Sequence, residues 1–392
     1  MIFCSNTNNA LFYSSVDDIN DKVWQSLACE NNIYFNRNFL KSVEKNHPKI
    51  TFSYIVLIDK NQNPIAFSSI QIVDFHIDAI KNDLEILLRK VKNIGRKLHI
   101  LPNKKPLKIL ISGNTFISGE HGIFIKKNQN KKVIIKELAK AILHFVNSDK
   151  KLKKEIDAFL LKDFINESLF ITDELKDYNY HPFLVEPNMK FDLFENWQTF
   201  DDYLASMKTK FRVKAKKALQ LSAEIKIENV TTINIQDQLP KMTALYKKVS
   251  SNADFNLGDF NLETYLDLKE KFGENYILKT YWLQNKIVGF ISGIINQNSL
   301  DAHFVGIDYQ LNREYAIYQR MLYDYVEIAI NKNLSTINFG RTASEIKSSV
   351  GAKAQDLTMY VRHKKSITNR ILKLFLQRIQ PTPFQEKSPF KN

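Results

Sequence analysis

Cysteine is almost absent from this chain: only Cys4 and Cys29 occur among its 392 residues. Two isolated thiols provide neither a disulfide framework nor a pair of metal ligands, so the sequence predicts a reducing, cytoplasmic setting and no metal chemistry. Long apolar runs are lacking too, because no stretch reaches the roughly 18 residues that a membrane-spanning helix needs. Residues 1–15 lack the basic start and continuous apolar core of a secretion signal. We therefore expect a cytoplasmic protein that is at most peripheral on the inner membrane.

Acidic residues are outnumbered by basic ones. The chain has 56 Lys and Arg residues against 42 Asp and Glu residues, which gives a net charge of +14. Such a charge favours anionic partners, which include nucleic acid, an anionic membrane surface and a phosphate-bearing cofactor. With 44% hydrophobic and 25% charged residues, the composition is that of a globular protein, and the length suggests two or three domains.

A strongly basic stretch lies near the middle of the chain, in residues 197–221. Apolar residues recur there at helical spacing, and cations crowd into residues 208–217 with no acidic residue among them. The pattern predicts one amphipathic helix with a cationic surface. A helix that only keeps a surface soluble usually mixes charges of both signs. We therefore expect this helix to bind an anion, and a merely solvated face is the alternative.

The chain alternates helical and strand patterns, and its second half repeats the order of the first. The expected elements of the first half are short helices in 16–46, a strand hairpin in 51–75, a helix in 77–104, a strand at 107–114, a helix at 131–147 and a strand near 157–165. After the basic helix, those of the second half are a strand at 223–230, two helices, three strands in 275–308, a helix at 313–331 and a strand at 335–340.

This repetition predicts an α/β fold, with mixed α+β sheets, made by tandem duplication. Two prolines within residues 178–193 place the junction between the copies at about 180–195. We expect an N-terminal module over 1–190, a C-terminal module over 191–362 and a basic amphipathic tail over 363–392.

Five segments of the sequence resemble the FemAB-like branch of the GNAT acyltransferases, a group of peptidoglycan biosynthesis and recognition proteins. They are GNTFISGEHG (113–122), HPFLVEPNM (181–189), YLASMKTKFRVKAKKA (203–218), HFVGIDYQLN (303–312) and NFGRTASEIKSSVGA (338–352). The resemblance implies two GNAT-like modules, of which we expect the N-terminal one to be degenerate. It also implies acyl transfer to an amine, with an acyl-CoA, an acylated carrier protein or an aminoacyl-tRNA as the donor.

In this family the donor lies where two central strands diverge, which implies a site between the strand ending near 303–308 and the strand ending at 339–340. The family's Gly-rich pyrophosphate loop is replaced here by residues 306–321, which contain one glycine. Either a carrier protein or tRNA then replaces CoA, or Arg313, Arg320 and the basic helix neutralise the phosphates.

Candidate catalytic residues lie on or after the first of these strands. His303, flanked by Asp301 and Asp308, is the first candidate for the base that accepts a proton from the attacking amine. A buried structural histidine is the alternative. Tyr309 and Tyr318 are candidates for the acid that protonates the departing thiolate, although aromatic residues at this spacing also serve packing.

Candidate donor-binding residues are mostly cations, in the basic helix or near the carboxyl edge of the sheet, where α/β ligands commonly bind. Arg341 suits a phosphate or carboxylate because its planar fork binds such groups at two points. An ion pair with Glu345 is its alternative role. The full set is Lys210, Arg212, Lys214, Lys216, Arg313, Arg341, Glu345 and Lys347.

The tail carries a further amphipathic pattern. Residues 362–379 place apolar side chains along one side of a predicted helix, with cations around them. This is typical of a helix at an anionic lipid surface. Docking onto its own domain fits the pattern equally well.

Three functions remain open at this point. The first is an N-acyltransferase that moves an acyl group from a thioester donor to an amine on a lipid or cell-envelope precursor. The second is an aminoacyl-tRNA-dependent transferase, in which the basic helix contacts tRNA phosphates. The third is a non-catalytic binding module. We favour the first, with the C-terminal module active.

Overall fold

The computed structural model describes residues 9–75, 106–252 and 258–391, and the helix expected over 77–104 lies outside them. The first half contains β1 (Ala10–Tyr13), α1 (Asp21–Leu27), α2 (Arg37–Asn46), β2 (Thr51–Ile58), β3 (Pro64–Phe75), β4 (Leu107–Ser112), β5 (Ile123–Ile125), α4 (Lys131–Ser148), α5 (Lys150–Glu155), β6 (Ile156–Phe164), α6 (Leu169–Thr172) and β7 (His181–Asp192). The second half contains α7 (Phe200–Ser206), α8 (Thr209–Leu221), β8 (Lys226–Asn229), α9 (Ile235–Ser250), α10 (Thr264–Phe272), β9 (Tyr276–Leu283), β10 (Lys286–Asn296), β11 (Ser299–Ile307), α11 (Tyr309–Tyr315), α12 (Ile317–Asn331), β12 (Thr336–Asn338), α13 (Ser344–Ser348), β13 (Lys353–His363) and α14 (Ser366–Leu376).

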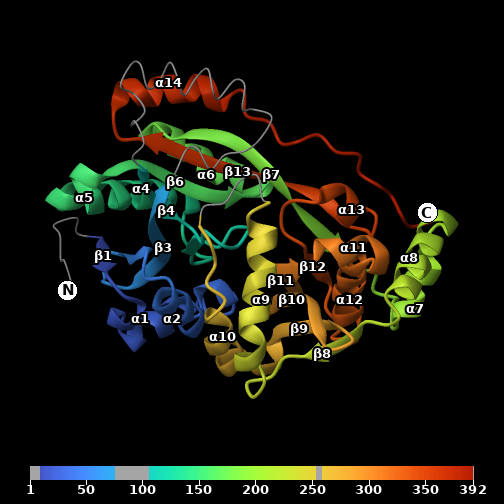
Figure 1. Cartoon of the computed structure of the whole chain (residues 1–392). Helices are drawn as coiled ribbons and strands as arrows, with labels where there is room; N and C mark the ends of the chain where they lie inside the picture. The colour runs from blue at the N-terminus through green and yellow to red at the C-terminus, as the bar shows by residue number, and fades with distance from the viewer. Residues whose placement is uncertain (1–8, 76–105, 253–257, 392) are drawn as a thin grey trace.

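The described strands form one 13-stranded sheet in the order β1-β2-β3-β4-β6-β13-β7-β12-β11-β10-β9-β8, with β5 paired to β3 (Figure 1). Each half has four antiparallel neighbours followed by a parallel pair: β1 to β4 and then β6 in the first half, β8 to β11 and then β12 in the second. Strands such as β2 and β3 are apolar on both faces because the sheet is covered on both sides. The predicted mixed α/β fold and the repeated order of elements are confirmed.

The two halves exchange their last strands. β7, the last strand of the first half, pairs with β12 and β13, whereas β13, the last strand of the chain, pairs with β7 and with β6. The expected junction at about 180–195 is therefore mostly strand, and the boundary at residue 190 falls inside β7. Its prolines are tolerated because Pro182 lies near the strand start and Pro187 lies where the register with β13 shifts.

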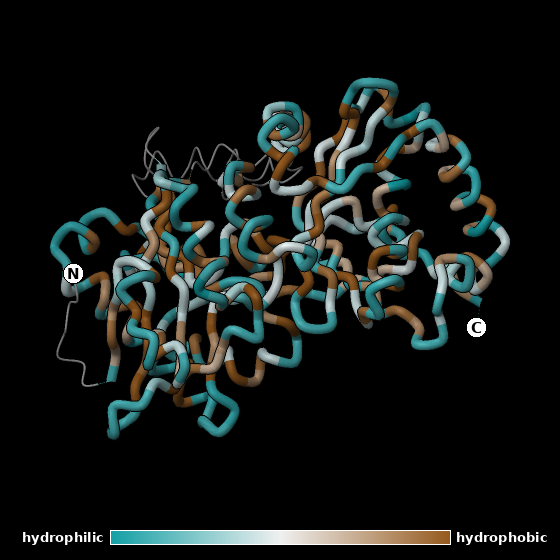
Figure 2. The backbone as a smooth tube through the Cα atoms, turned by 90° about the horizontal axis from the view of Figure 1, so that it is seen from below, coloured by the Kyte–Doolittle hydropathy of each residue, from teal (hydrophilic) through white to brown (hydrophobic). Residues whose placement is uncertain are grey.

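The hydrophobic core also joins the two halves. Tyr34, Phe39 and Phe67 of the first half belong to the same buried cluster as Tyr265 and Phe290 of the second. In Figure 2 the hydrophobic stretches lie mainly in the interior, and the outer turns are mostly hydrophilic. The halves are thus two copies of one pattern that share a sheet and a core.

The predicted central helix is two helices. α7 ends at Ser206 and α8 begins at Thr209, because the C-terminal segment inserts its backbone at the break. Met207 forms a β-bridge with Phe390, and the amide of Lys208 donates to the carbonyl of Pro389 over 2.8 Å. Figure 1 shows the end of the chain returning to the side of α7 and α8.

The tail packs on its own molecule along much of its length. α14 lies against β7 and β13, with Leu376 buried, while Ile367 and Leu374 are exposed. The predicted apolar stripe is therefore divided between a docked side and a solvent side. None of the described helices is long and apolar enough to cross a membrane.

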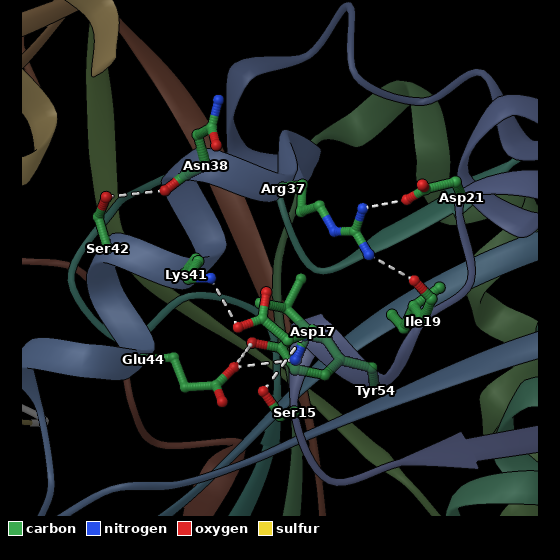
Figure 3. Close-up of polar contacts among 11 residues, drawn as sticks. Ser15, Asp17, Ile19, Asp21, Arg37, Asn38, Lys41, Ser42, Glu44 and Tyr54 are labelled. Carbon is green, nitrogen blue, oxygen red and sulfur yellow. Dashed lines mark hydrogen bonds and ion pairs between the residues drawn. The ribbon is translucent and has the colours of Figure 1, made fainter. Parts of the chain in front are cut away.

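A polar network fixes the start of the first half (Figure 3). Glu44 on α2 accepts from the amide of Val16 over 3.1 Å and from the hydroxyl of Tyr54 over 2.8 Å. Arg37, at the start of α2, donates to the carbonyl of Ile19 over 2.6 Å. The short turn of residues 33–35 immediately precedes α2, so this network holds the turn that contains Tyr34.

Candidate active site

β11 and β12 diverge at the centre of the second half. Their parallel pairing covers only Ser299–Asp301 against Thr336–Asn338. β11 continues to Ile307, whereas the chain after β12 turns toward β7, where the amide of Phe339 donates to the carbonyl of Met189 over 2.9 Å. These are the two strands that the sequence resemblance implied would diverge.

The divergence leaves an open backbone edge on β11. The amide of Phe304 donates to the Oγ of Ser292 over 3.0 Å, and the amide of Asp308 donates to the carbonyl of Val288 over 2.8 Å, so both point toward β10. Because backbone groups alternate in direction along a strand, those of His303 and Val305 point to the opposite, unpaired side. An extended ligand can pair with such an edge.

A cavity of about 280 Å³ lies beside this edge and is built from both halves. Its walls are β11, α9, α12 and the segment after β12 from the second half, and residues 115–118 with Lys162 from the first half. The polar residues of its wall include Thr115, Lys162, Asn188, Asp301, His303, Tyr318, Asn338, Arg341 and Lys347.

His303 is connected to a carboxylate through a tyrosine of the other half. The hydroxyl of Tyr34 lies 2.9 Å from Oδ2 of Asp301 and 3.0 Å from Nε2 of His303. An ionised carboxylate only accepts hydrogen bonds, so the single tyrosine proton is donated to Asp301 and the tyrosine oxygen accepts from Nε2–H of His303. In this tautomer Nδ1 of His303 carries the free lone pair. The arrangement orients a base, as the histidine needs if it is to take a proton.

Burial keeps this histidine neutral. Desolvation lowers the pKa of His303 to about 4, despite the opposing effect of Asp301. Burial, followed by the Asp301 carboxylate, raises the pKa of Tyr34 well above its ordinary value, so Tyr34 remains protonated. Tyr318, on α12 across the cavity, also has its pKa raised by burial and retains its proton at neutral pH.

A charged triad joins the halves on another wall of the cavity. Nζ of Lys162 lies 2.8 Å from Oδ2 of Asp163, and Oδ1 of the same carboxylate pairs with Arg341. The pairing of β6 with β13 shifts register at this point, and Asp163 adopts a left-handed φ of 64°. Such a bulge lets neighbouring side chains, which would alternate in a regular strand, lie on the same side. The carboxylate is completely buried between two cations, which hold the pKa of Asp163 below its usual range against the effect of burial.

Lys347 fixes the loop that carries Arg341. Its Nζ lies 2.8, 3.2 and 2.7 Å from the carbonyl oxygens of Phe339, Gly340 and Arg341. Burial lowers the pKa of Lys347 to about 7. Three carbonyl acceptors match the three donors of an ammonium group, so they favour the charged form. The ammonium is used to hold backbone, which differs from its expected role of contacting the donor directly.

The predicted site residues separate into two groups. His303, Tyr318, Arg341 and Lys347 line the cavity. The others lie outside its walls, and several are exposed: these are Tyr309, Arg313, Glu345, Lys210, Arg212, Lys214 and Lys216. Glu345 pairs with Lys387 at 2.9 Å, and Arg341 pairs with Asp163, so the expected alternative pair of Arg341 with Glu345 does not form.

The outlying cations lie around the segment that follows β11. α8 packs against α11 and α12 through buried Ala215 and Ala218, and its lysines face solvent. One amide in the first turn of each of α11 and α12 is occupied by a side chain of the chain itself: Asp308 accepts from the amide of Gln310, and Asn312 accepts from the amide of Tyr318 over 2.8 Å. A pyrophosphate normally contacts the amides at a helix start, and these two are already in use.

The site residues missed at the sequence level include Tyr34, Lys162 and Asp163. Tyr34 left no signal in the sequence, because only the fold brings the turn before α2 to β11. Lys162 and Asp163 did leave a signal, because two adjacent charged residues interrupt the apolar run of the buried strand β6. Buried charges require partners, so such a pair inside a core strand could have marked them as site residues.

The fold defined by these features is that of the tandem GNAT proteins. A tandem GNAT protein from the clavulanic acid biosynthesis pathway has a TM-score of 0.52 and 8% sequence identity, over 90% of this chain and 98% of that chain. FemX has a TM-score of 0.52 and 10% identity, over 85% of this chain and 92% of that chain. Neither a model of a known protein family nor the sequence of a curated protein matches this chain. At these identities the likeness shows the fold alone, and the expected fold of tandem GNAT-like modules is confirmed.

Proposed function

We propose that the protein is an N-acyltransferase that uses a thioester donor, with its active site in the second half. The observation that carries this proposal is the divergence of β11 from β12 directly beside His303. The open edge at His303 and Val305 can pair with the amides of a pantetheine arm, as an added strand would. The likeness in fold to tandem GNAT proteins supports the same reading.

The chemistry would need two proton transfers. The amine nitrogen forms a bond to the carbonyl carbon of the thioester, and Nδ1 of His303 takes the proton that the nitrogen loses. The carbon–sulfur bond breaks, and Tyr318 supplies a proton to the departing sulfur. His303 is suited to the first transfer because Tyr34 and Asp301 fix its tautomer, and Tyr318 is suited to the second because burial keeps its hydroxyl protonated.

The donor carrier and the acceptor are finer parts of the proposal. The partly occupied starts of α11 and α12, together with the cations around them, favour a carrier whose phosphates or acidic groups contact Arg313 and the exposed lysines of α8. An acyl carrier protein and acyl-CoA are both compatible with that surface. The exposed Ile367 and Leu374 of α14 support an acceptor on a lipid or cell-envelope precursor near an anionic membrane surface.

Aminoacyl transfer from tRNA is a second candidate function. The exposed basic surface of α8 would contact tRNA phosphates, and the fold is similar to that of FemX. This function predicts steeply salt-dependent binding of tRNA and no response to thioesters.

The test is a transfer assay with a panel of donors: acetyl-CoA, a long-chain acyl-CoA, an acylated carrier protein and charged tRNA. Mass spectrometry would follow acylation of a mixture of amines. We expect product from a thioester and a loss of about 10²- to 10⁴-fold in rate for His303→Ala, the usual range for a positioned base. His144→Ala is the matched control, because this partly buried histidine packs on Phe12, away from the cavity.

Two results would overturn the proposal. Unchanged turnover in His303→Ala would remove His303 from the mechanism. A lack of product with every donor, together with tight binding of an amine, would leave a non-catalytic binding module.

A further inference from the structure

Two cations beside the cavity share one carboxylate. Lys162 and Arg341 both pair with Asp163, and Lys162 is only 4% exposed. The cavity wall also contains Asp301, but its oxygens already accept from Tyr34, Ser299, Asn296 and Asn338. Burial lowers the pKa of Lys162, and a second anion beside Lys162 and Arg341 would favour the charged form of this lysine.

Buried polar atoms without partners lie on the same cavity. Among the described residues, Nε of Arg341, Oγ1 of Thr115 and Oδ1 of Asn188 are buried and have no hydrogen-bond partner, and all three side chains line the cavity. Unsatisfied buried groups are rare in native proteins and call for an explanation. A bound ligand that contacts all three explains them together.

The hydrogen-bond network determines what each of these atoms can bind. The carboxylate of Asp301 only accepts, so the amide of Asn338 must present its NH₂ to Asp301, at 2.6 Å, and its oxygen to Asn188. Asn188 in turn presents its NH₂ to Asn338 at 3.2 Å and keeps its own oxygen free. The cavity therefore offers free donors at Arg341 and Thr115 and a free acceptor at Asn188.

The groups that would bind an anion are held in place from both halves. The amide of Gly119 donates to Asp163 over 3.2 Å, the bulge in β6 directs Lys162 and Asp163 to one side, and Lys347 ties down the loop of Arg341. That loop has positive φ at Gly340, Thr342 and Ala343. Non-glycine residues in this conformation cost free energy and cluster at functional sites. Such fixed geometry is expected of a binding site rather than of a solvated surface.

We propose that the acceptor is an amine that also carries an acidic group, a carboxylate or a phosphate, which binds to Lys162, Arg341 and Thr115 while the nitrogen lies between Asn188 and His303. The role of the nitrogen rests on the proposed acyl transfer. The anion site does not, because it is defined by groups that the transfer chemistry does not use. Carboxylate and phosphate share the oxyanion chemistry that a guanidinium and a hydroxyl recognise.

Binding without any donor tests this inference. Matched pairs of probes, L-alanine with L-alaninamide and phosphoethanolamine with ethanolamine, would be titrated by calorimetry into the whole protein. We expect the acidic member of at least one pair to bind roughly 10-fold tighter or more, since hydrogen bonds to charged groups are the stronger ones. The two pairs separate a carboxylate from a phosphate. Equal affinity within both pairs would overturn the proposal.

Two variants assign the effect to this site. Arg341→Gln should abolish the preference for the acidic probe, but it also leaves Asp163 with one cation and can weaken the fold. Thr115→Val avoids that problem, because its Oγ1 has no partner to lose. We expect it to melt no lower than the wild type and to bind the acidic probe several-fold more weakly. Thr358→Val, at a buried threonine of β13 outside the cavity, is the matched control. Unchanged binding in both Arg341→Gln and Thr115→Val would exclude the site.

The outcome is separable from that of the proposed function. Acyl transfer to neutral and acidic amines alike would retain the transferase and exclude the anion site. Tight binding of an acidic probe without transfer from any donor would retain the anion site and exclude the transferase.

Discussion

The two halves pair their strands in the same order, but the parallel pair extends to the end of the strand in the first half and not in the second. In the first half β4 pairs with β6 to its last residue, Ser112, which lies opposite Leu161. In the second half β11 runs on to Ile307 after its last partner. One copy therefore has a closed edge and the other an open one, and the open edge lies beside His303, whose tautomer is fixed through Tyr34.

Two glycines explain how the strand edge of the first half is closed. The chain after β4 turns back so tightly that a Cβ on Gly122 would lie 2.7 Å from the Cα of Gly113. The same turn sends the amide of Gly119 to Asp163 and the ring of His121 against Tyr34, with ring centroids 4.1 Å apart. The copy that lacks an open edge thus supports the site of the other copy. This is a structural reason to regard the first half as degenerate.

Proline substitutions in the corresponding strands β4 and β11 should show the largest difference between the two halves. Ile111→Pro, in β4, removes an amide from a strand that is paired on both sides, so we expect a loss of about 3 kcal/mol or more in the free energy of unfolding. Val305→Pro, in β11, removes an amide that points to the open edge. It should cost far less stability and should raise the donor KM about 10-fold or more. Urea unfolding and donor titration are the measurements. An equally large loss of stability in both variants would mean that the edge of β11 is not open.

Acid provides a second, intermediate test, because His121 of the first half and His303 of the second both contact Tyr34. Burial lowers the pKa of each to about 4. Between about pH 6.5 and pH 4 the unfolded chain therefore binds protons that the folded chain does not. The contribution of the two neutral histidines to stability should therefore be fully present above this window. It should be lost as the pH falls through the window, so that the free energy of unfolding decreases.

Other histidines shift in the same direction, so the informative quantity is the difference between variant and wild type. Desolvation is also the main cause that lowers the pKa of His47 and His363. His121→Asn and His303→Asn should each lose less stability between about pH 7 and pH 5 than the wild type does, measured by urea unfolding. A drop as steep as that of the wild type in both variants would contradict the pKa assignment.

Charge reversal on helices of the two halves should have the smallest effect on stability. Lys210, Lys214 and Lys216 of α8 are exposed, so their replacement by Glu should change the unfolding free energy by about 0.5 kcal/mol or less per site. Donor binding should weaken, and its dependence on salt should become shallower. Replacement of the exposed Lys150, Lys151 and Lys153 of α5 is the control with the same change in net charge. Equal donor affinity in both triple variants at low salt would show that the lysines of α8 only form a solvated surface and do not bind the donor.

Much of the fold could be predicted from the sequence because periodicity reflects burial directly. The hairpin over 51–75 and the helix over 131–147 match β2, β3 and α4 closely, since their apolar patterns arise from contacts within each half. The break at Met207 could not be predicted, because its cause is a backbone contact from Phe390. The exchange of β7 and β13 has the same origin: strand pairing across the sequence leaves no local signal.

The site residues also divide into those with a local signal in the sequence and those that depend on contacts between distant segments. His303 and Arg341 were found because they lie within segments that resemble a known family, and Tyr318 because it follows the first of these segments closely; all three line the cavity. Tyr34 lies far from them in the sequence, and its position depends on the packing of α2. The exposed lysines of α8 show the converse: a conspicuous sequence pattern lies outside the cavity, and its role in donor binding stays a prediction.

The exchanged strands also affect how the chain is synthesised. β6 is complete once residue 164 has been made, yet its neighbour β13 spans residues 353–363, which are made much later. The first half therefore leaves the ribosome with an unpaired strand edge, which is a hazard for aggregation. In the folded protein β13 fills this edge and links β6, which carries Asp163, to β7. The order of synthesis thus leaves the strand edge beside Asp163 unpaired until β13 has been made.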